Sequence, residues 1–370
     1  MDEVAPTAAL SGDRVVDEGG LTSADTWMRR EIAEIPAVVA RLLDEGAAEV
    51  SAAADAIRVT APLFAMIAAR GTSDHAAVYG RYLLETHLGI PTGLAAPSVT
   101  TAYRTNLRWT GGLLVAVSQS GTSPDIVEVT SAARRAGGLT IAITNAPRSP
   151  LGRAAQVTID CRAGVERSVA ATKSYVAQLV VFLALVAVAS PSERLRRSLV
   201  RMPGDLEAVL RRSADWIVDP AGPVGTIAAT DRCLVVSRGY NLATALEIAL
   251  KLKETAAIFA EPYSAADFLH GPVRLADPAV PLLALRPPGP IGRSLDAAVE
   301  VAARRGSPVW CVRLAGVASP RCLVLGVRQP DLASPLLLVV PGQLLAESVA
   351  RARGLDPDAP PGLVKATRTR

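Results

Sequence analysis

Short apolar runs alternate with longer stretches of helical periodicity along most of the chain. The run Leu113 to Val117 is wholly apolar and predicts a buried strand, and a polar loop and a helix ending at Arg135 follow it. Strands that alternate with helices indicate parallel βαβ units, so the pattern predicts an α/β fold with doubly wound sheets. The predicted strands are residues 63–69, 113–117, 140–144, 157–160, 233–237, 280–285, 309–312 and 336–340. The predicted helices are residues 26–56, 76–88, 124–135, 171–189, 242–258, 295–305 and 344–353.

This alternation occurs twice, which indicates an internal duplication. Ala69-Arg70-Gly71 and Ser237-Arg238-Gly239 each follow a predicted strand and precede a helix that carries a glutamate near its end. Two copies of one αβα module explain the pattern most simply. The loop from Arg286 to Gly289 in the second copy lacks the hydroxyl groups of the corresponding first loop. We therefore expect only the first copy to bind phosphate.

Changes in composition set the predicted domain boundaries. Residues 1–25 are polar and rich in glycine and alanine, so we expect them to be disordered. Residues 26–190 form the first predicted domain and residues 205–353 the second, and residues 191–204, with prolines and several arginines, form a predicted linker. Residues 354–370 begin with a proline-rich stretch that cannot be helical, so they form a C-terminal tail.

The polar loop that follows the first apolar run is suited to hold an anion. It contains Ser118, Gln119, Ser120 and Gly121, and Ser123 suits the N-cap of the next helix. A helix N-terminus presents unpaired N–H groups, and hydroxyl groups donate further hydrogen bonds. Because the loop has no lysine, it is not a nucleotide-binding loop of the Walker type, and a small phosphate monoester fits better. An ordinary capped polar loop is the alternative interpretation.

Composition and charge exclude several classes of function. Aromatic residues make up only 4% of the chain and the net charge is +4, which argues against nucleic-acid binding and suits small anionic substrates. The four cysteines are far apart, with neither metal-ligand spacing nor a disulfide framework. The longest apolar run, Val176 to Ala189, is too short to cross a membrane, and the N-terminus has no signal-peptide pattern. We expect a cytoplasmic protein without a membrane partner, a metal or another cofactor.

Two groups of residues could carry proton chemistry. Glu247, Lys251 and Glu254 have spacings of four and three, which place them on one face of a helix. A solvated stripe of ion pairs is the simpler interpretation, but the rest of this helix is apolar and it follows a strand end, where α/β sheets bind ligands. His270 precedes a glycine and a proline in a turn and can exchange protons near neutral pH, or it could serve only as a hydrogen-bonding residue.

Several stretches in order along the chain resemble one family. They are Met28 to Pro36, Arg70 to Ala76, Val117 to Gly121, Val169 to Lys173, Arg238 to Tyr240, Ala245 to Glu254, His270 to Pro272 and Leu363 to Lys365. Together they resemble the double sugar-isomerase (SIS) domain family, particularly the isomerase half of glucosamine-6-phosphate synthase, from about residue 28 to residue 370. The resemblance implies two tandem αβα sandwich domains of flavodoxin-like type with parallel sheets, followed by a catalytic tail.

The resemblance also implies roles for particular residues. The positions that match the binding site for the sugar 6-phosphate and the sugar are Ser73, Ser118, Gln119, Ser120, Ser123, Val169 and Ala171. Glu254 matches the base that moves a proton between C1 and C2, and Lys251 matches a neighbouring lysine. His270 matches a residue that assists ring opening and comes from the partner subunit, so a homodimer is expected. Lys365 matches a lysine that forms a Schiff base with the ketose.

Departures from the synthase narrow the predicted function. The isomerase pattern begins close to Met1, so we expect no built-in glutaminase. Asp74 stands where the synthase has an aromatic residue, and Ala171 stands where it has a serine. The stretch Ala170-Ala171-Thr172-Lys173 and the tail with Pro360-Pro361 are more similar to stand-alone aminosugar-phosphate deaminases. We predict an enzyme that converts glucosamine 6-phosphate, or a related hexosamine 6-phosphate, to fructose 6-phosphate and ammonia. The alternatives are an ammonia-dependent, glutaminase-less synthase-type isomerase, a ketosamine-6-phosphate deglycase, and a sugar-phosphate sensor without catalytic activity.

Overall fold

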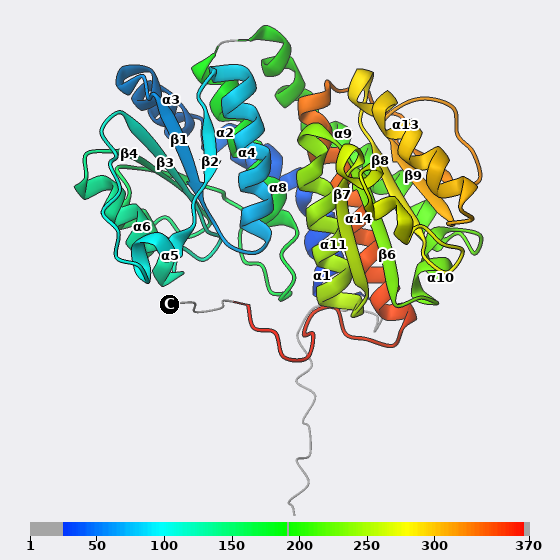
Figure 1. Cartoon of the computed structure of the whole chain (residues 1–370). Helices are drawn as coiled ribbons and strands as arrows, with labels where there is room; N and C mark the ends of the chain where they lie inside the picture. The colour runs from blue at the N-terminus through cyan, green and yellow to red at the C-terminus, as the bar shows by residue number, and fades with distance from the viewer. Residues whose placement is uncertain (1–24, 191, 366–370) are drawn as a thin grey trace, which may run out of the picture.

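Two α/β modules lie side by side in the computed structural model, which describes residues 25–190 and 192–365 (Figure 1). Each module contains a five-stranded sheet in which every pair of neighbouring strands is parallel. The strands of the first sheet are β1 (Phe64–Ala68), β2 (Thr92–Leu94), β3 (Gly112–Val117), β4 (Leu139–Thr144) and β5 (Val157–Asp160). The strands of the second are β6 (Arg232–Ser237), β7 (Phe259–Ser264), β8 (Leu282–Arg286), β9 (Val309–Arg313) and β10 (Cys322–Val324).

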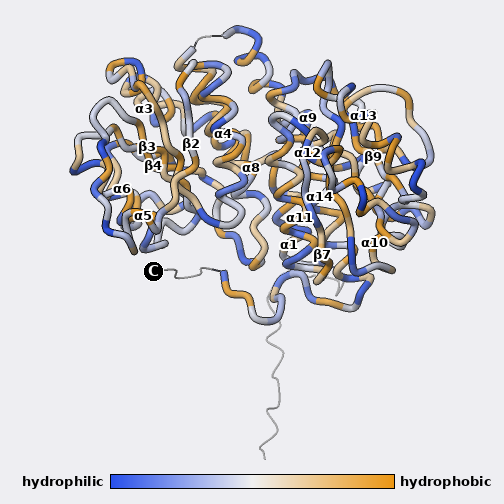
Figure 2. The backbone as a smooth tube through the Cα atoms, viewed as in Figure 1, coloured by the Kyte–Doolittle hydropathy of each residue, from blue (hydrophilic) through white to orange (hydrophobic). Residues whose placement is uncertain are grey.

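The two sheets have the same topology, as the predicted duplication requires. The first sheet has the strand order β2-β1-β3-β4-β5, and the second has the order β10-β9-β8-β6-β7. The two orders are the same when β6 to β10 are matched in turn to β1 to β5 and the second sheet is read from its other edge. The predicted α/β fold with two parallel sheets is confirmed. Figure 2 shows the alternation that produced this prediction, with hydrophobic strands inside and polar loops outside.

Helices cover both faces of each sheet and fill the space between the modules (Figure 1). In the first module they are α1 (Trp27–Ala33), α2 (Ile35–Glu45), α3 (Ala47–Thr60), α4 (Thr72–Leu88), α5 (Pro97–Thr101), α6 (Pro124–Arg135), α7 (Pro150–Ala154) and α8 (Lys173–Ala189). The remaining α-helices are α9 (Glu193–Val218), α10 (Pro223–Ala228), α11 (Leu242–Ala256), α12 (Ala265–Leu269), α13 (Gly289–Arg304) and α14 (Ser334–Ala352). Short 3-10 helices are η1 (Gly239–Asn241), η2 (Pro272–Leu275) and η3 (Asp331–Ala333).

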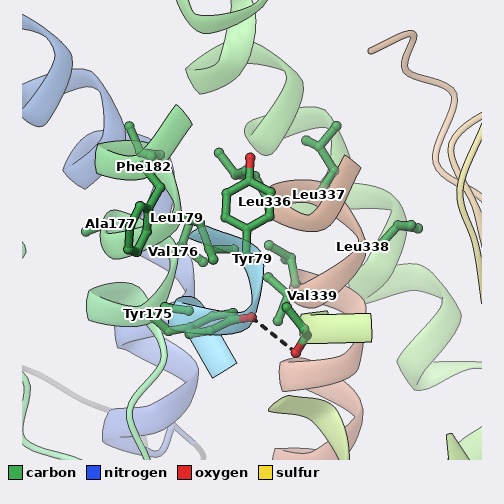
Figure 3. Packing of buried hydrophobic residues seen from close by; sticks show 14 of the residues in the cluster. Tyr79, Tyr175, Val176, Ala177, Leu179, Phe182, Leu336, Leu337, Leu338 and Val339 are labelled. Atoms are coloured by element: carbon green, nitrogen blue, oxygen red, sulfur yellow. Dashed lines mark hydrogen bonds between the residues drawn. The ribbon is translucent and has the colours of Figure 1, made fainter. Parts of the chain in front are cut away.

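The helices α4, α8, α11 and α14 join the modules into one core (Figures 1 and 3). Within each module, a glycine lets two of these helices pack closely. A Cβ at Gly80 would lie 2.4 Å from the Phe182 ring, and a Cβ at Gly342 would lie 2.1 Å from Ile248. In Figure 3 the Tyr175 hydroxyl crosses this interface, and it donates a hydrogen bond to the carbonyl of Ala243 at 3.3 Å. Elements of both modules are therefore held rigidly against each other.

The predicted linker at residues 191–204 is largely helical in the structure. Residues 193–218 form α9, which begins at the N-cap Ser192 and contains Pro203. Its buried residues include Leu195, Leu199 and Met202, whose helical spacing forms one apolar face. Burial of this face outweighs the local cost of a proline within the helix, so the arginines between these positions belong to its polar face rather than to a linker.

The predicted strand at residues 336–340 is wrong, because this run lies within α14. All five of these residues are buried, so the run shows no one-sided periodicity, and a short apolar run does not distinguish a strand from a buried helix. The window Asp331–Ala352 is long and apolar enough to cross a membrane by length and composition, but 94% of it is buried within the protein. We interpret α14 as a core helix.

Three strands were not predicted. β2 and β10 are very short, and β7 contains Glu261 and Pro262, which interrupt its apolar pattern. The disorder predicted for residues 1–25 falls, apart from Asp25, outside the described residues. Residues 354–365, the described part of the tail, contain no helix, as predicted.

Candidate active site

A cavity of about 390 Å³ opens where β1 and β3 end. These strands are neighbours in the sheet, but the chain leaves them toward different faces, and this kind of switch point is where parallel α/β sheets bind ligands. The residues that line the cavity are Arg70, Gly71, Thr72, Ser73, Ser118, Gln119, Ser120, Ser123, Val169, Ala171, Ser174, Gln178, Glu254, Leu363, Val364 and Lys365. The structure thus brings together every predicted substrate-binding residue and two of the predicted catalytic residues.

The loop after β3 forms a hydroxyl-lined turn at one end of the cavity. Gly121 has a φ of +62°, and a Cβ there would lie 2.0 Å from Ser149 Oγ, so the loop can close only on a glycine. The Gly121 N–H donates to Ser118 Oγ at 3.2 Å, and the hydroxyls of Ser120 and Thr122 lie 2.9 Å apart. This turn directs several donors toward one small volume, as an anion site requires.

Ser123 occupies the N-cap position of α6, as predicted, but its hydroxyl does not cap the helix. Among the described residues, no backbone N–H donates a capping hydrogen bond to it. The Ser123 hydroxyl is therefore oriented for a role other than stabilising the helix, and it lines the cavity. An anion bound here would also benefit from the positive end of the α6 dipole.

Arg70 adds a positive charge that the sequence prediction did not assign to the site. Its Nε donates to the buried Asp125 Oδ2 at 2.8 Å, and its side chain remains about half exposed at the cavity. Across the cavity, Gln178 Nε2 donates to Ser73 Oγ at 3.0 Å and fixes that hydroxyl. These contacts hold the loops after β1 and β3 in one arrangement, so the anion site is formed before a ligand binds.

Helix α11 contributes the carboxylate of Glu254 to the lining of the cavity, and a buried lysine of the same helix supports it. Lys251 Nζ donates to Glu254 Oε2 at 2.5 Å and to Thr72 Oγ1 at 3.0 Å, and it lies 3.4 Å from Glu247 Oε1. The side chains of Glu247 and Lys251 are fully buried, whereas that of Glu254 is 25% exposed and lines the cavity. The alternative of a solvated stripe is therefore wrong, because two of its three members have no contact with solvent.

The charge of Lys251 is stabilised by its surroundings. Burial by itself lowers the pKa of Lys251, but the carboxylates of Glu247 and Glu254 outweigh this effect and hold the pKa above its ordinary value. Glu247 also accepts a hydrogen bond from Thr72 Oγ1 at 3.2 Å and lies 2.8 Å from His75 Nδ1. Lys251 is thus a permanent cation that orients Glu254 toward the cavity.

The C-terminal tail closes one side of the cavity with Lys365. Lys365 Nζ donates to the Ser168 carbonyl at 2.6 Å and to Glu166 Oε2 at 3.0 Å. Burial raises the pKa of Glu166, but Lys365 and hydrogen bonds from Thr172 and Ser174 outweigh it, so the pKa stands below its ordinary value. Glu166 was not predicted, since nothing in the sequence around it marks a buried carboxylate.

A second contact fixes the tail at Asp358. Its carboxylate accepts hydrogen bonds from the N–H groups of Trp27 and Met28, both at 2.7 Å, and its carbonyl accepts one from the Val169 N–H at 3.0 Å. The tail therefore caps the first turn of α1, although the two segments lie near opposite ends of the sequence. This contact lies next to the segment that supplies Val169 and Ala171 to the cavity.

We expect Asp358→Ala to loosen the tail. The change removes a charged acceptor from two backbone N–H groups, which corresponds to about 2–3 kcal/mol of docking free energy. Hydrogen exchange of residues 355–365 should become roughly thirtyfold faster or more, while the exchange of β3 stays unchanged. Asp356→Ala is the matched control, since Asp356 accepts only the Asp358 N–H at 2.9 Å within the tail itself. Equal exchange rates in the two variants would contradict the anchoring role.

Comparison with known proteins identifies the family. The model of the SIS domain matches residues 65–188 and 226–315, which together are more than half of the chain. The chain belongs to the SIS-domain family. The two matched segments correspond to the two modules, so this is a protein with tandem SIS domains.

Relatives of this SIS protein include aminosugar enzymes. It is 37% identical over 359 residues to the glutamine–fructose-6-phosphate aminotransferase (isomerizing) of Gloeobacter violaceus, a match that covers 92% of this chain and 58% of that relative. The chain thus spans little more than half the length of this relative. Its structure is similar to that of a protein assigned as a phosphosugar isomerase from Silicibacter pomeroyi, with a TM-score of 0.81, 38% identity and coverage of 90% and 100% of the two chains.

A glucosamine-6-phosphate deaminase from Thermotoga maritima has the same fold. The TM-score is 0.72 and the match covers 93% of this chain and 100% of that chain, but the sequence identity is only 20%. This likeness therefore bears on the fold alone.

His270 is the one predicted catalytic residue that lies apart from the others. It is exposed at the end of α12 in the second SIS domain, where its N–H donates to the Asp267 carbonyl at 3.0 Å. It is absent from the lining of the cavity within residues 25–190 and 192–365. A single chain therefore does not bring this imidazole to Glu254, and its contribution from a partner subunit stays a prediction.

The second SIS domain has a different environment at the position that corresponds to the anion site. A Cβ at Gly239 would lie 3.3 Å from Ile291 Cγ2, so an apolar side chain packs close to the end of β6. Arg286, at the end of β8, is held by Asp296 through hydrogen bonds of 2.7 and 2.8 Å. These contacts favour the prediction that only the first domain binds phosphate.

Proposed function

We propose that this chain is an aminosugar-6-phosphate deaminase and isomerase, which converts glucosamine 6-phosphate or a related hexosamine 6-phosphate to fructose 6-phosphate and ammonia. The observation that carries the proposal is the single cavity that holds an anion site, a carboxylate on a buried lysine, and a second lysine from the tail. A site that only binds a sugar phosphate would have no need for all three. The similarity to a glutamine–fructose-6-phosphate aminotransferase supports a sugar 6-phosphate as the substrate.

The phosphate of the substrate would bind at the hydroxyl turn. Ser118, Ser120 and Ser123 supply donors there, and Arg70 supplies charge. The sugar then extends toward α11 and the tail, because the cavity is bounded by Glu254 and Lys365 in that direction. Binding energy gained at the phosphate would thus hold C1 and C2 beside the reacting groups.

Glu254 would act as the base. After ring opening, its carboxylate takes the proton from C2 of the 2-amino aldose while water gives a proton to the C1 oxygen, and an enolamine forms. The same carboxyl group returns the proton to C1 while the amino nitrogen loses one proton to water, which leaves an imine at C2 and a hydroxyl group at C1. Lys251, whose charge the buried carboxylates stabilise, donates a hydrogen bond to Glu254 Oε2 and holds this side chain in position for both steps.

Loss of ammonia would follow by hydrolysis. Water adds to the C2 imine, the C–N bond of the resulting carbinolamine breaks, and ammonia leaves as the C2 ketone of fructose 6-phosphate forms. In a second route the imine would exchange onto the Lys365 amine, which lines the same cavity, and hydrolysis of that Schiff base would release the ketone.

The test is an assay of ammonia release by the full chain with glucosamine 6-phosphate, galactosamine 6-phosphate and fructosamine 6-phosphate. The proposal predicts ammonia with fructose 6-phosphate from glucosamine 6-phosphate, or ammonia with the C4-epimeric ketose, tagatose 6-phosphate, from galactosamine 6-phosphate. Turnover of fructosamine 6-phosphate alone would instead identify a deglycase. Binding of these sugar phosphates without any ammonia, at high enzyme concentration and in both reaction directions, would reject the proposed activity.

Borohydride treatment during turnover separates the two routes to ammonia. Reduction of a Schiff base would attach the sugar to Lys365 and inactivate the enzyme, whereas direct hydrolysis predicts no sugar on Lys365 and undiminished activity after dialysis. Lys365→Met should then retain the proton exchange at C2 while ammonia release slows. The exchange serves as the control for an intact fold.

A mixture of inactive variants tests whether His270 acts across a dimer interface. If His270 completes the site of its partner, then a mixed dimer of Glu254→Gln and His270→Ala chains contains one site with both groups intact. Random pairing then predicts recovery of about a quarter of the wild-type activity. No recovery, with mixed dimers demonstrated by differential tagging, would contradict a shared site.

A further inference from the structure

The outer edge of the second sheet carries a pair of cysteines. Cys311 on β9 and Cys322 on β10 are direct partners in the parallel ladder, and both side chains are partly exposed. Their side chains lie on the same face of the sheet. Both cysteines lie in the second SIS domain, away from the residues that line the cavity. The proposed function makes no use of them.

The backbone geometry at this pair permits a covalent bond. Neighbouring strands lie about 4.8 Å apart, and a disulfide accepts Cα separations of roughly 4.4–6.8 Å. The side chains of register partners project from the same face of the sheet, so the two sulfur atoms face each other across adjacent strands. Because β10 is the edge strand, a small oxidant can reach Cys322 from solvent.

Two arginines make this pair chemically reactive. The neighbouring Cys311 thiol, together with the charges of Arg313 and Arg286, outweighs the effect of partial burial and lowers the pKa of Cys322 to about 7. Asp296 is the acidic group of this cluster, and it is engaged by Arg286 through two hydrogen bonds. A large fraction of Cys322 is therefore thiolate at neutral pH, which is the nucleophilic form.

We propose that Cys311 and Cys322 form a peroxide-sensitive dithiol that oxidises to a reversible disulfide between β9 and β10. The Cys322 thiolate attacks a hydroperoxide, an S–O bond forms and the O–O bond breaks, which gives a sulfenic acid and releases water or an alcohol. Cys311 then attacks the Cys322 sulfur, the S–S bond forms, the S–O bond breaks, and water leaves with the proton of the Cys311 thiol. Two thiols lose two electrons and two protons, and one peroxide is reduced.

The other cysteines provide an internal comparison. Cys161 and Cys233 are fully buried, and burial raises the pKa of both thiols, to about 12 at Cys233. Neither is a register partner of another cysteine within the sheets. We expect both to stay reduced under conditions that oxidise the exposed pair completely.

The experiment treats the folded full-length protein with hydrogen peroxide, blocks remaining thiols after unfolding, and maps tryptic peptides. Cleavage after Arg305, Arg313, Arg321 and Arg328 places the two cysteines on separate peptides, residues 306–313 and 322–328. The proposal predicts one species that joins these peptides, lighter than their sum by two hydrogen atoms and separated again by dithiothreitol. Equal oxidation of Cys161 or Cys233 would overturn it, as would oxidation of the pair to sulfinic acid without any linked species.

Single variants test the order of the steps. Cys311→Ser should accumulate a sulfenic acid at Cys322 that a dimedone probe labels, whereas Cys322→Ser should leave Cys311 unlabelled at the same peroxide concentration. Arg313→Gln should slow formation of the linked species by roughly threefold or more at neutral pH, since it raises the pKa of Cys322. The mechanism would be overturned if the probe labelled Cys311 in the Cys322→Ser variant as fast as it labels Cys322 in the Cys311→Ser variant. The two thiols would then not differ in reactivity.

Discussion

Glu254→Gln should lower kcat for ammonia release by about a thousandfold, because a positioned general base contributes roughly 10²–10⁴ to the rate of proton transfer. The amide is almost the same size as the carboxylate and can still accept the hydrogen bond from Lys251, so the site should keep its shape. The affinity for the phosphate end of the substrate should change little, since the hydroxyl turn lies at the other end of the cavity. Exchange of the C2 hydrogen in deuterium oxide measures the affected step directly.

The matched control for this variant is Glu261→Gln. Glu261 lies on β7 in the same domain and pairs at 3.5 Å with Lys253 on the surface, so the same chemical change there should leave kcat within a factor of two or so. If Glu254→Gln retained C2 exchange at the wild-type rate, another group would be the base and the proposed mechanism would be wrong. If both variants lost activity equally, the effect would not be specific to the cavity.

Lys251→Met should destabilise the fold by about 3–5 kcal/mol, which is the usual cost of leaving a buried charge without its partner. Glu247 is fully buried, and without Lys251 it would keep only Thr72 and His75 as partners. Unfolding by guanidinium, followed by circular dichroism, measures the loss. This effect is large because the ion network lies between α4 and α11, where the two domains join.

Two further variants identify the cause of this loss. The double variant Lys251→Met with Glu247→Gln removes the unpaired charge and should recover most of the lost stability. Lys253→Met, on the same helix but 41% exposed, should cost less than about 1 kcal/mol. A double variant as unstable as the single one would show that lost packing, rather than the buried charge of Glu247, causes the destabilisation.

The elements that the sequence predicted well have a clear periodicity and clear ends. The strand after residue 112 is a continuous apolar run, and its helix begins at Ser123-Pro124, so both were predictable from local patterns. Helix α4 ends at Gly89, whose φ of +66° suits a glycine after a helix. By contrast, Leu336 to Val340 is buried on every side, and α9 contains a proline, so local patterns failed in both.

The residues of the candidate site also divide into those that local patterns predicted and those that they did not. The hydroxyl turn was predictable because its residues are consecutive, and Glu254 and Lys251 because their spacing places them on one helical face. Glu166 and Asp358 were not, since each acquires its role from a partner far away in sequence. Glu166 binds Lys365 across 199 residues, and Asp358 binds Trp27 across 331.

The sequence by itself determined the two α/β domains, the anion-binding turn and the residues that resemble the family's catalytic groups, because each of these depends on short-range periodicity or on consecutive residues. Only the tertiary structure decided that α4 and α11 bury one ion network between the domains, and that the tail returns to α1 and closes the cavity. The physical reason is that the burial of a charge and the docking of a tail depend on contacts between distant segments, whose free energies no local pattern records.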